Sequence, residues 1–540
     1  MEKLKGIIAM PFNPKNLLSK NVLILALIIA AIFACFWPAL GNDFVLWDDP
    51  AYILENTLAR TLSWANTKQI FSTYILGNYQ PLTILTFSLE HHFFGLNPFA
   101  YHATNLLLHA ANTLLVYLLI MRLCAKMPIA ALTALLFAIH PTRVESVAWA
   151  AERKDVLFAF FYLLGLLQYW RYLEAKEVGA RHAVPLLWIT FLYFVLSLLS
   201  KPAAVSFPLA IVLLDYIRPR RLSARSVNEK IPFFLASLAF GTVAIFGTFT
   251  PTNAAYPVTD TVTGTLNRTI TPLDQIRLTE EEFTLKDNAF ITCRALVNYL
   301  VRTVWPQPLS PYYPLPEKTD NRLPGDYYLA AGVVLLLILL LARWYNKPAR
   351  FCAMFFFVTV FFNLPVGRIG SVEIADRFTY IPYIGLFYFL AMAVTAAEVK
   401  LRFAKPILDN ILKAAVALFV FFLAANTLLY AQVWKNSGRL WTTVINLYPE
   451  DPKGYFNRGN YFFDRRDYKR AVRDYRTAII LKPHDPRIHF NLGNCYLYLG
   501  RPELAIQTYD EAMRVDGRYT VPLKNRSIAV EILKKMRNKW

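Results

Sequence analysis

Long apolar runs recur through the first 430 residues and are separated by short polar segments. A helix that crosses a membrane needs about 20 mostly apolar residues. The first such run is 21–40, and the others are 100–121, 124–139, 156–169, 183–199, 203–214, 231–249, 327–342, 351–366, 378–397 and 414–430. Because lysines precede the first run, we interpret it as an uncleaved anchor with its N-terminus inside. The pattern therefore predicts about eleven transmembrane helices.

One further run, 289–305, carries Arg294, Asn298 and Arg302. We interpret it as an amphipathic helix that lies in the membrane interface, within an outer loop at 250–326. With eleven spans, every short basic loop then falls on one side of the membrane, as the positive-inside rule requires. A twelfth span would reverse all the later loops. The same topology places the first outer loop, 41–99, and the C-terminal region outside the cytoplasm.

The composition agrees with a membrane protein. Hydrophobic residues make up 56% of the chain, charged residues 17%, and the mean hydropathy is +0.34. A soluble enzyme, a disordered chain and a disulfide scaffold are disfavoured, since soluble domains are less apolar and more charged. The net charge of +20 is explained by topology and anionic lipids, and motifs for nucleic acid are absent. No two of the five cysteines form a CxxC, so no zinc or other metal site is predicted.

The last hundred residues are polar and repeat with a period of 34. The pairs Asn457/Asn491, Gly459/Gly493 and Tyr475/Tyr509 are each 34 residues apart. This period, with small residues where two helices cross, is typical of tetratricopeptide repeats. We expect a membrane domain at 1–433 and a repeat domain at 434–540, with repeats at 451–484 and 485–518 and half repeats beside them. The repeats either close off the chain or form a concave surface that binds protein.

Unusual polar residues gather where this topology places the outer membrane face. Ionisable groups at membrane depth are costly and often mark a functional site. Those singled out are Asp48, Asp49, His102, Asn105, His109, Asn112, His140, Glu145, Glu152, Arg153, Lys154, Asp155, Lys201, Asp376, Arg377 and Tyr380.

Each has a purely structural alternative. Asp49 precedes Pro50 and suits a helix N-cap, which leaves Asp48 as the better candidate base. The histidines could bond across helices, the cations Arg153, Lys154 and Lys201 could snorkel to headgroups, and Arg377 could pair only with Asp376. What these alternatives leave unexplained is that carboxylates, imidazoles and cations all gather on one side.

Moving a sugar from a lipid phosphate to a hydroxyl requires such a set. A carboxylate must accept the proton of the acceptor, and fixed cations must stabilise the departing phosphate. Asp48, with Arg153, Lys201 and Arg377 facing the phosphate and Lys154 in reserve, would supply both. P-loop and GxGxxG fingerprints are absent, which argues against a cytosolic nucleotide donor.

Five segments, in order, resemble the transmembrane-and-tetratricopeptide-repeat family of protein O-mannosyltransferases, particularly its bacterial-looking members. They are WDDPAYILEN, YQPLTILTFSLEHHFFGLNPFAYHATNLLLH, AIHPTRVESVAWAAERKDVLFAFFYLL, SKPAAVSFPLAIVLLDY and ADRFTYIPYIGLF. With the repeats, the resemblance covers nearly the whole chain.

The resemblance implies an all-α, polytopic glycosyltransferase of the C type (GT-C) that uses a polyprenyl-phosphate sugar and inverts the sugar carbon, with no obligatory metal or cofactor. Undecaprenyl or dolichyl phosphate would be the carrier. The family's acidic pair maps onto Asp48 and Asp49, its HP…E…R-x-D stretch onto His140, Glu145, Arg153 and Asp155, and its basic-tyrosine motif onto Arg377 and Tyr380. Some relatives have arginine where this chain has Gln80; if that arginine binds phosphate, another cation must replace it here.

We therefore expect a membrane enzyme that transfers a single sugar, with mannose as the candidate, to Ser/Thr hydroxyls of extracytoplasmic proteins recruited through the repeats. Its expected place is a bacterial inner membrane, with site and repeats on the periplasmic side. His102, Asn105, His140, Glu145, Asp155, Asp376 and Tyr380 would support the site. Two alternatives remain: an enzyme that glycosylates a lipid or envelope polysaccharide, and a non-catalytic scaffold.

Overall fold

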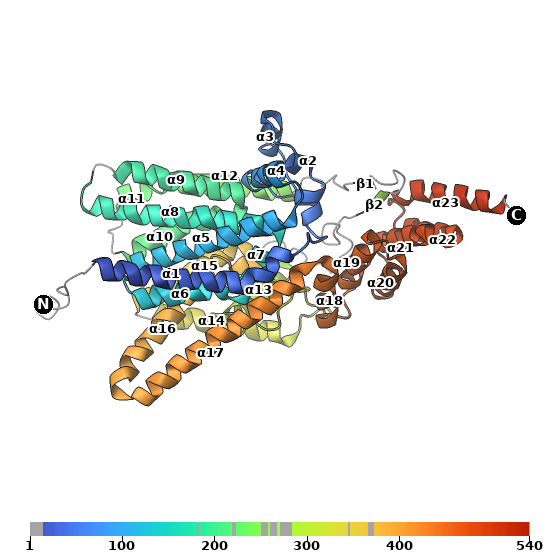
Figure 1. The fold of residues 1–540 in the computed structure, drawn as a ribbon. Helices are drawn as coiled ribbons and strands as arrows, with labels where there is room; N and C mark the ends of the chain where they lie inside the picture. Colours follow the sequence, from blue (N-terminus) through green and yellow to red (C-terminus); the bar gives the residue numbers. More distant parts are fainter. Residues whose placement is uncertain are drawn as a thin grey trace, which may run out of the picture.

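The chain forms a bundle of long helices, and a row of shorter helices, α18–α23, extends from one end of it (Figure 1). The structure, a computed structural model, describes residues 14–180, 183–218, 223–249, 257–259, 267–269, 283–343, 346–365 and 372–538. Much of the predicted outer loop 250–326 lies outside the described residues. The predicted all-α membrane fold with C-terminal repeats is confirmed.

Eight helices in the described ranges are long and apolar enough to cross a membrane. These apolar stretches overlap the helices α1 (Pro14–Phe36), α5 (Pro98–Cys124), α8 (Arg153–Glu177), α9 (Ala183–Ser200), α12 (Ile231–Phe249), α14 (Gly325–Arg343), α16 (Tyr383–Ala404) and α17 (Pro406–Ala431).

The other three predicted spans are also helical but shorter: α6 (Met127–Ile139), α10 (Phe207–Ile217) and α15 (Lys347–Val360). The pair Met127–Ile139 and Pro141–Ala148 bends by 57°, and it counts as a ninth span if taken as one. The bend falls at Pro141, which cannot donate a backbone hydrogen bond and disfavours a helical conformation in the residue before it. All three helices pack within the bundle, α6 against α5 and α16, and α10 against α15.

Other elements, most of them short, connect these helices. They are η2 (Trp37–Gly41), η3 (Pro50–Leu54), α2 (Thr57–Arg60), α3 (Trp64–Ile70), α4 (Pro81–Phe94), η4 (Pro141–Arg143), α7 (Val144–Ala148), η5 (Ala150–Glu152), η6 (Pro202–Ser206), α11 (Ala224–Asn228), β1 (Pro257–Thr259), β2 (Asn267–Thr269), α13 (Leu285–Arg302), η8 (Phe361–Asn363), η9 (Asp376–Thr379) and η10 (Gln432–Lys435). The strands β1 and β2 pair antiparallel. The helix α13 covers most of the segment interpreted as interfacial.

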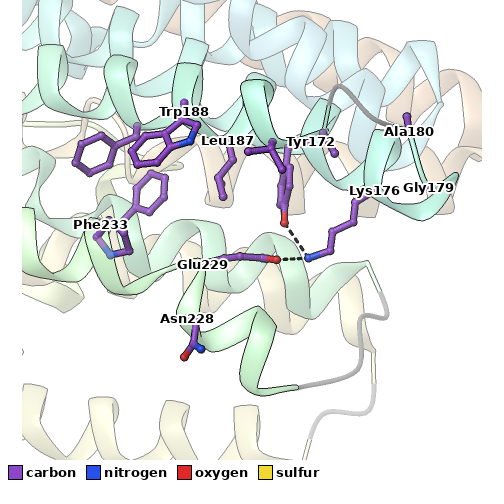
Figure 2. Close-up of a pocket in the computed structure, with 13 residues that line it drawn as sticks. Tyr172, Lys176, Gly179, Ala180, Leu187, Trp188, Asn228, Glu229 and Phe233 are labelled. Carbon is purple, nitrogen blue, oxygen red and sulfur yellow. Dashed lines mark hydrogen bonds and ion pairs between the residues drawn. The ribbon is translucent and has the colours of Figure 1, made fainter.

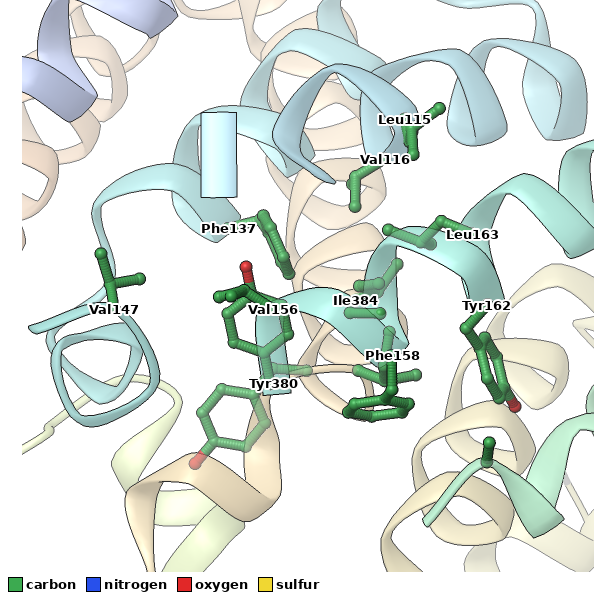
Figure 3. Packing of buried hydrophobic residues seen from close by; sticks show 14 of the residues in the cluster. Leu115, Val116, Phe137, Val147, Val156, Phe158, Tyr162, Leu163, Tyr380 and Ile384 are labelled. Carbon is green, nitrogen blue, oxygen red and sulfur yellow. The ribbon is translucent and has the colours of Figure 1, made fainter. Parts of the chain in front are cut away.

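Buried aromatic and aliphatic side chains fill the bundle around Tyr380 (Figure 3). The Phe137 ring meets the Tyr380 ring edge-on, with centroids 5.2 Å apart. Val156, at the start of α8, and Ile384, in the first turn of α16, are also buried in this cluster. The packing fixes the beginning of α8 against the segment that leads into α16, and this is where the polar residues gather.

The repeat domain consists of α18 (Ser437–Leu447), α19 (Pro452–Asp464), α20 (Tyr468–Leu481), α21 (Pro486–Tyr498), α22 (Pro502–Val515) and α23 (Pro522–Arg537). The spacing of 34 brings a glycine against a tyrosine twice: a Cβ on Gly459 would lie 2.7 Å from the Tyr475 ring, and one on Gly493 2.5 Å from the Tyr509 ring. Any larger residue would separate the paired helices. The predicted boundary at 433/434 falls within η10.

Four tryptophans join the repeat domain to the first outer loop. Trp149 stacks on Trp434 and on Trp47, with centroids 5.2 and 4.9 Å apart, and Trp47 also contacts Trp441 of α18 at 5.1 Å. Beside them the Leu46 backbone N–H donates to the Ser437 hydroxyl at 2.7 Å. The loop that carries the acidic pair is thus packed directly against the first repeat helix.

Candidate active site

Asp49 ties the first outer loop to the start of α8. Its carboxylate accepts the backbone N–H of Val45 at 2.6 Å and that of Ala151 at 2.9 Å, and its side chain is fully buried. Burial raises the pKa of Asp49 to about 7, against the lowering effect of these two hydrogen bonds. Asp49 occupies the N-cap position of η3, but its side chain makes no capping bond. The capping interpretation is therefore wrong, because both oxygens are turned to other backbone groups.

Asp48 belongs to a chain of charges that reaches Arg377. The Lys154 ammonium lies 3.5 Å from the Asp48 carboxylate and 3.0 Å from that of Glu152, and the Arg377 guanidinium lies 3.6 Å from Glu152. Arg377 also pairs with Glu145, and its backbone N–H donates to Glu145 at 2.8 Å. The side chain of Asp48 is 21% exposed, whereas those of Glu145 and Glu152 are 1% exposed. Asp48 is thus the accessible carboxylate of this group.

Lys201 joins the cluster from the segment between α9 and η6. Its ammonium pairs with Asp155, whose other oxygen accepts the Ser146 hydroxyl at 3.0 Å. Lys201 and Arg377 line one small pocket, and both lie near the Phe378 ring, at 5.8 and 5.0 Å. The structure therefore brings Lys154, Lys201 and Arg377 together with Asp48.

Arg153 points elsewhere. Its guanidinium donates to Glu90 and to the Tyr101 carbonyl, both at 2.9 Å, and to the Asn105 side chain. The side chain is fully buried and lies over the Phe87 ring at 5.4 Å. Its partners come from α4 and α5, so Arg153 anchors α8 to these helices rather than joining the Lys154–Arg377 group.

The polar face of α5 contacts the residue that ends α7, the first turn of α8 and a residue just before α16. Asn105 donates to the Trp149 carbonyl at 3.0 Å, and Asn112 donates to the Val156 carbonyl at 2.8 Å. His109 bonds the Tyr380 hydroxyl at 2.8 Å. His102 is buried on the same face. The structural alternative of bonds across helices accordingly describes His109 well.

His140 and Tyr380 are both buried and hold the bent segment after α6. The His140 ring bonds the Thr142 hydroxyl at 2.8 Å and packs edge-on against Tyr383. The Tyr380 carbonyl accepts the Arg143 guanidinium at 2.7 Å. These residues position the carboxylate of Glu145, four residues beyond Pro141.

Asp376 and Arg377 do not form the isolated pair that their adjacency suggests. Asp376 accepts the Tyr313 hydroxyl at 3.1 Å and lies 3.7 Å from Arg302. Burial raises the pKa of Asp376, against the lowering effect of Arg302. Burial lowers the pKa of Arg377, but the carboxylates of Glu145 and Glu152 raise it by more. The pKa is therefore raised overall, and this guanidinium stays protonated. The neighbouring side chains of Asp376 and Arg377 in η9 therefore bind different partners.

Two residues important for this geometry were not among the predicted site residues. Glu152 joins Lys154 to Arg377, and Arg143 holds the Thr379 and Tyr380 carbonyls at 3.0 and 2.7 Å. Glu152 stands beside Arg153 and Lys154 in sequence, and that run of alternating charge was its available signal. Arg143 had none, because its partners lie more than 230 residues away. Among the described residues, no group of three or more His, Cys, Asp or Glu could hold a metal ion.

Comparison with known proteins gives one family match and several similar relatives. Residues 456–516 match the model of the tetratricopeptide repeat family. The chain is 37% identical over 172 residues to protein O-mannosyl-transferase TMTC1 of Homo sapiens, covering 28% of this chain and 18% of that protein. It is 32% identical over 218 residues to Tmtc1 of Drosophila melanogaster (39% and 24% covered) and 30% over 161 residues to human TMTC3 (28% and 17%).

Two structures of oligosaccharyltransferases from Archaeoglobus fulgidus also resemble the chain. One, AglB with an inhibitory peptide and a dolichol-phosphate, has a TM-score of 0.40 at 13% identity and covers 77% of this chain and 56% of that one. The other, tethered to an acceptor peptide, has a TM-score of 0.41 at 14% identity (79% and 57% covered).

The matches to the curated relatives span about a fifth of their length. Within that part, the resemblance expected from the motifs is confirmed: this chain is similar to the TMTC protein O-mannosyl-transferases.

Proposed function

We propose that the chain is a membrane glycosyltransferase of the GT-C type that transfers a single sugar, with mannose as the candidate, from a polyprenyl phosphate to a Ser or Thr hydroxyl of a protein. The observation that carries the proposal is the continuous set of charges from Asp48 through Lys154 and Glu152 to Arg377. It pairs an accessible carboxylate with two cations, Lys154 and Arg377, which is what transfer from an anionic lipid donor requires.

Asp48 is the proposed general base. Its neighbour Asp49 has both oxygens engaged by the Val45 and Ala151 N–H groups, so it cannot approach an acceptor hydroxyl without breaking the loop. Asp49 is therefore a positioning residue: it fixes the Asp48 backbone against the start of α8. Asp48 would take the hydroxyl proton as the oxygen attacks the sugar carbon from the face opposite the phosphate, and the configuration would be inverted.

Lys154, Lys201 and Arg377 are the proposed phosphate ligands. Each is paired with a carboxylate in this structure, so donor binding would exchange some of these partners for phosphate oxygens. Charge-assisted hydrogen bonds to phosphate are strong in such partly buried sites. Glu145, Glu152 and Asp155 would then hold the cations in place before the donor arrives. Arg153, predicted as a ligand, is left out of the proposed group because its guanidinium bonds groups of α4 and α5, away from Asp48.

The repeats are the proposed acceptor platform. Trp441 of α18 packs against Trp47, the residue before Asp48, and Lys453 of α19 donates to the Tyr312 hydroxyl at 2.9 Å. A polypeptide bound along the repeats would thus be held close to the base. The proposed topology places this side outside the cytoplasm, periplasmic in a bacterial inner membrane.

The test uses the purified full chain, a panel of radiolabelled polyprenyl-phosphate sugars and extracytoplasmic proteins as acceptors. We expect transfer from one of these donors and none from nucleotide sugars. Transfer to a lipid or polysaccharide acceptor only would support the lipid-modifying alternative. No transfer from any donor, combined with loss of a protein complex on deleting the repeats, would support the scaffold.

A further inference from the structure

A second pocket lies at the other end of α8, far from the Asp48 cluster (Figure 2). Lys154 in the first turn of α8 and Lys176 in its last turn are 22 residues apart, about 33 Å at 1.5 Å per residue. That length is close to the thickness of a bilayer's hydrocarbon core. The two sites accordingly lie near opposite membrane interfaces.

The pocket has a volume of about 880 Å³ and opens between the ends of three membrane helices, α8, α9 and α12. One wall is apolar, with Leu187, Trp188 and Phe191 on α9 and Phe233 on α12. The Trp188 side chain is 63% exposed, which is a costly arrangement in water but a favoured one for tryptophan at a membrane interface.

The opposite end of the pocket holds a pair of opposite charges. The Lys176 ammonium pairs with Glu229 and donates to the Tyr172 hydroxyl at 2.9 Å. Figure 2 shows these three side chains meeting at one end, while Trp188 and Phe233 lie at the other. Both charged side chains remain partly exposed, Lys176 at 27% and Glu229 at 14%. The pocket is therefore polar at the interface and apolar toward the hydrocarbon core.

We propose that this pocket binds a phospholipid with an amine-bearing zwitterionic headgroup, of the phosphatidylethanolamine class. The lipid phosphate would bond Lys176, and its ammonium would donate to Glu229, so both charges keep a partner. An acyl chain would lie along Leu187, Trp188 and Phe191. A purely anionic headgroup would leave Glu229 beside a negative charge, and a choline headgroup has no N–H to donate to it. The occupancy of this site is independent of the function proposed for the other end of α8.

The test uses the full chain in phosphatidylcholine nanodiscs that contain a small fraction of phosphatidylethanolamine with a photoreactive group in one acyl chain. After illumination, the adducts are mapped by mass spectrometry. We expect labelling concentrated on the apolar wall of the pocket, and we expect unlabelled phosphatidylethanolamine to compete better than phosphatidylglycerol. Labelling spread evenly over the lipid-facing helices would overturn the proposal.

Glu229→Gln provides the decisive variant. It should lower labelling by the ethanolamine lipid about tenfold, the loss that corresponds to one charged hydrogen bond. Labelling by a photoreactive phosphatidylglycerol should hold or rise, because Lys176 is then released. Equal loss of both labels, or no change in either, would contradict the assignment.

Glu174→Gln is the matched control. Glu174 pairs with Arg122 at 3.0 Å near the same end of α8, but neither residue lines the pocket. This variant should leave both labels unchanged. A loss equal to that of Glu229→Gln would mean that the lipid responds to surface charge rather than to this pocket.

Discussion

The end of the bundle that carries Asp48 and the repeat domain both bury polar side chains, but they satisfy them in different ways. In the repeats, Asn460 accepts the Tyr475 hydroxyl at 2.7 Å and the Asn491 amide at 3.0 Å, and Asn494 accepts those of Tyr509 and Asn525 at 2.6 and 2.8 Å. Each of these bonds joins neutral groups on helices close along the chain, and the buried ion pair of the repeats, Arg487 with Asp485 at 2.7 Å, joins residues only two apart.

At the end of the bundle that carries Asp48, many of the buried groups are charged, and several of their partners are distant in sequence. Arg377 meets Glu145 from 232 residues away, and Lys154 meets Asp48 from 106. A buried ion pair is a weak source of stability, since desolvation offsets much of the attraction. The repeats therefore use local polar contacts to fix a fold, whereas a cluster of ions drawn together from distant segments is better explained by chemistry.

The largest effect should come from Arg377→Ala. It leaves Glu145 and Glu152 buried without this cation, which we expect to destabilise the chain by about 3 kcal/mol and to abolish sugar transfer. Thermal unfolding in detergent and a transfer assay measure the two effects. Arg377→Lys separates them, because it keeps the charge but loses the geometry. Full transfer by Arg377→Ala would exclude this residue as a phosphate ligand.

A variant in the repeat domain should lower stability without affecting sugar transfer. Asn494→Ala removes the acceptor of two buried bonds and should destabilise the repeat domain by about 2 kcal/mol. Transfer to a short peptide, which needs little contact with the repeats, should remain within about twofold of wild type. A loss as deep as that of Arg377→Ala would show that the two regions are not separable in this way.

Glu152→Gln should have a smaller effect on the site. Lys154 and Arg377 would lose the carboxylate that lies between them, and we expect kcat/KM for transfer to fall about tenfold, or about 1.4 kcal/mol. The fall should appear mainly in KM for the donor, since the base is unchanged. A decrease in kcat alone would assign Glu152 to the chemical step instead.

The smallest expected effect is the contribution of Asp49 to the pH dependence of stability. Because its folded-state pKa is raised to about 7, the folded chain holds this proton more tightly than the unfolded chain does. The stabilisation is complete below the unfolded value near 4 and is lost as pH rises through about 7. Asp49→Asn should therefore reduce the fall in melting temperature between pH 5 and pH 8. Asp43 is an exposed carboxylate of the same loop. If Asp43→Asn reduced the fall in melting temperature equally, the effect would not come from the raised pKa of Asp49.

Local patterns predicted much of this molecule. Hydropathy located the membrane helices, and the period of 34 located the repeats together with the residues Gly459, Gly493, Tyr475 and Tyr509 at their crossings. Such signals are local or periodic, so one sequence contains them. The sequence also singled out Asp48, Lys154, Lys201 and Arg377, because ionisable groups are rare at membrane depth; their roles in the chemistry stay predictions.

The partners of these residues could not be predicted. Whether Arg153 faced a donor or Glu90, and whether Arg377 paired with Asp376 or Glu145, depends on helix rotation and on contacts between distant segments. Glu152 was singled out but given no role in the site, and Arg143 was not singled out, for the same reason. The cap interpretation of Asp49 failed because tertiary hydrogen bonds to Val45 and Ala151 outweighed a local preference.

The central claim is that Asp48 performs chemistry on a donor held by the neighbouring cations. The most direct measurement compares donor binding with sugar transfer in Asp48→Asn, with Asp43→Asn, whose side chain is 59% exposed, as the control. We predict that Asp48→Asn binds the polyprenyl-phosphate sugar with near wild-type affinity while transfer falls about a thousandfold, and that Asp43→Asn changes neither. Unchanged transfer by Asp48→Asn would contradict the claim.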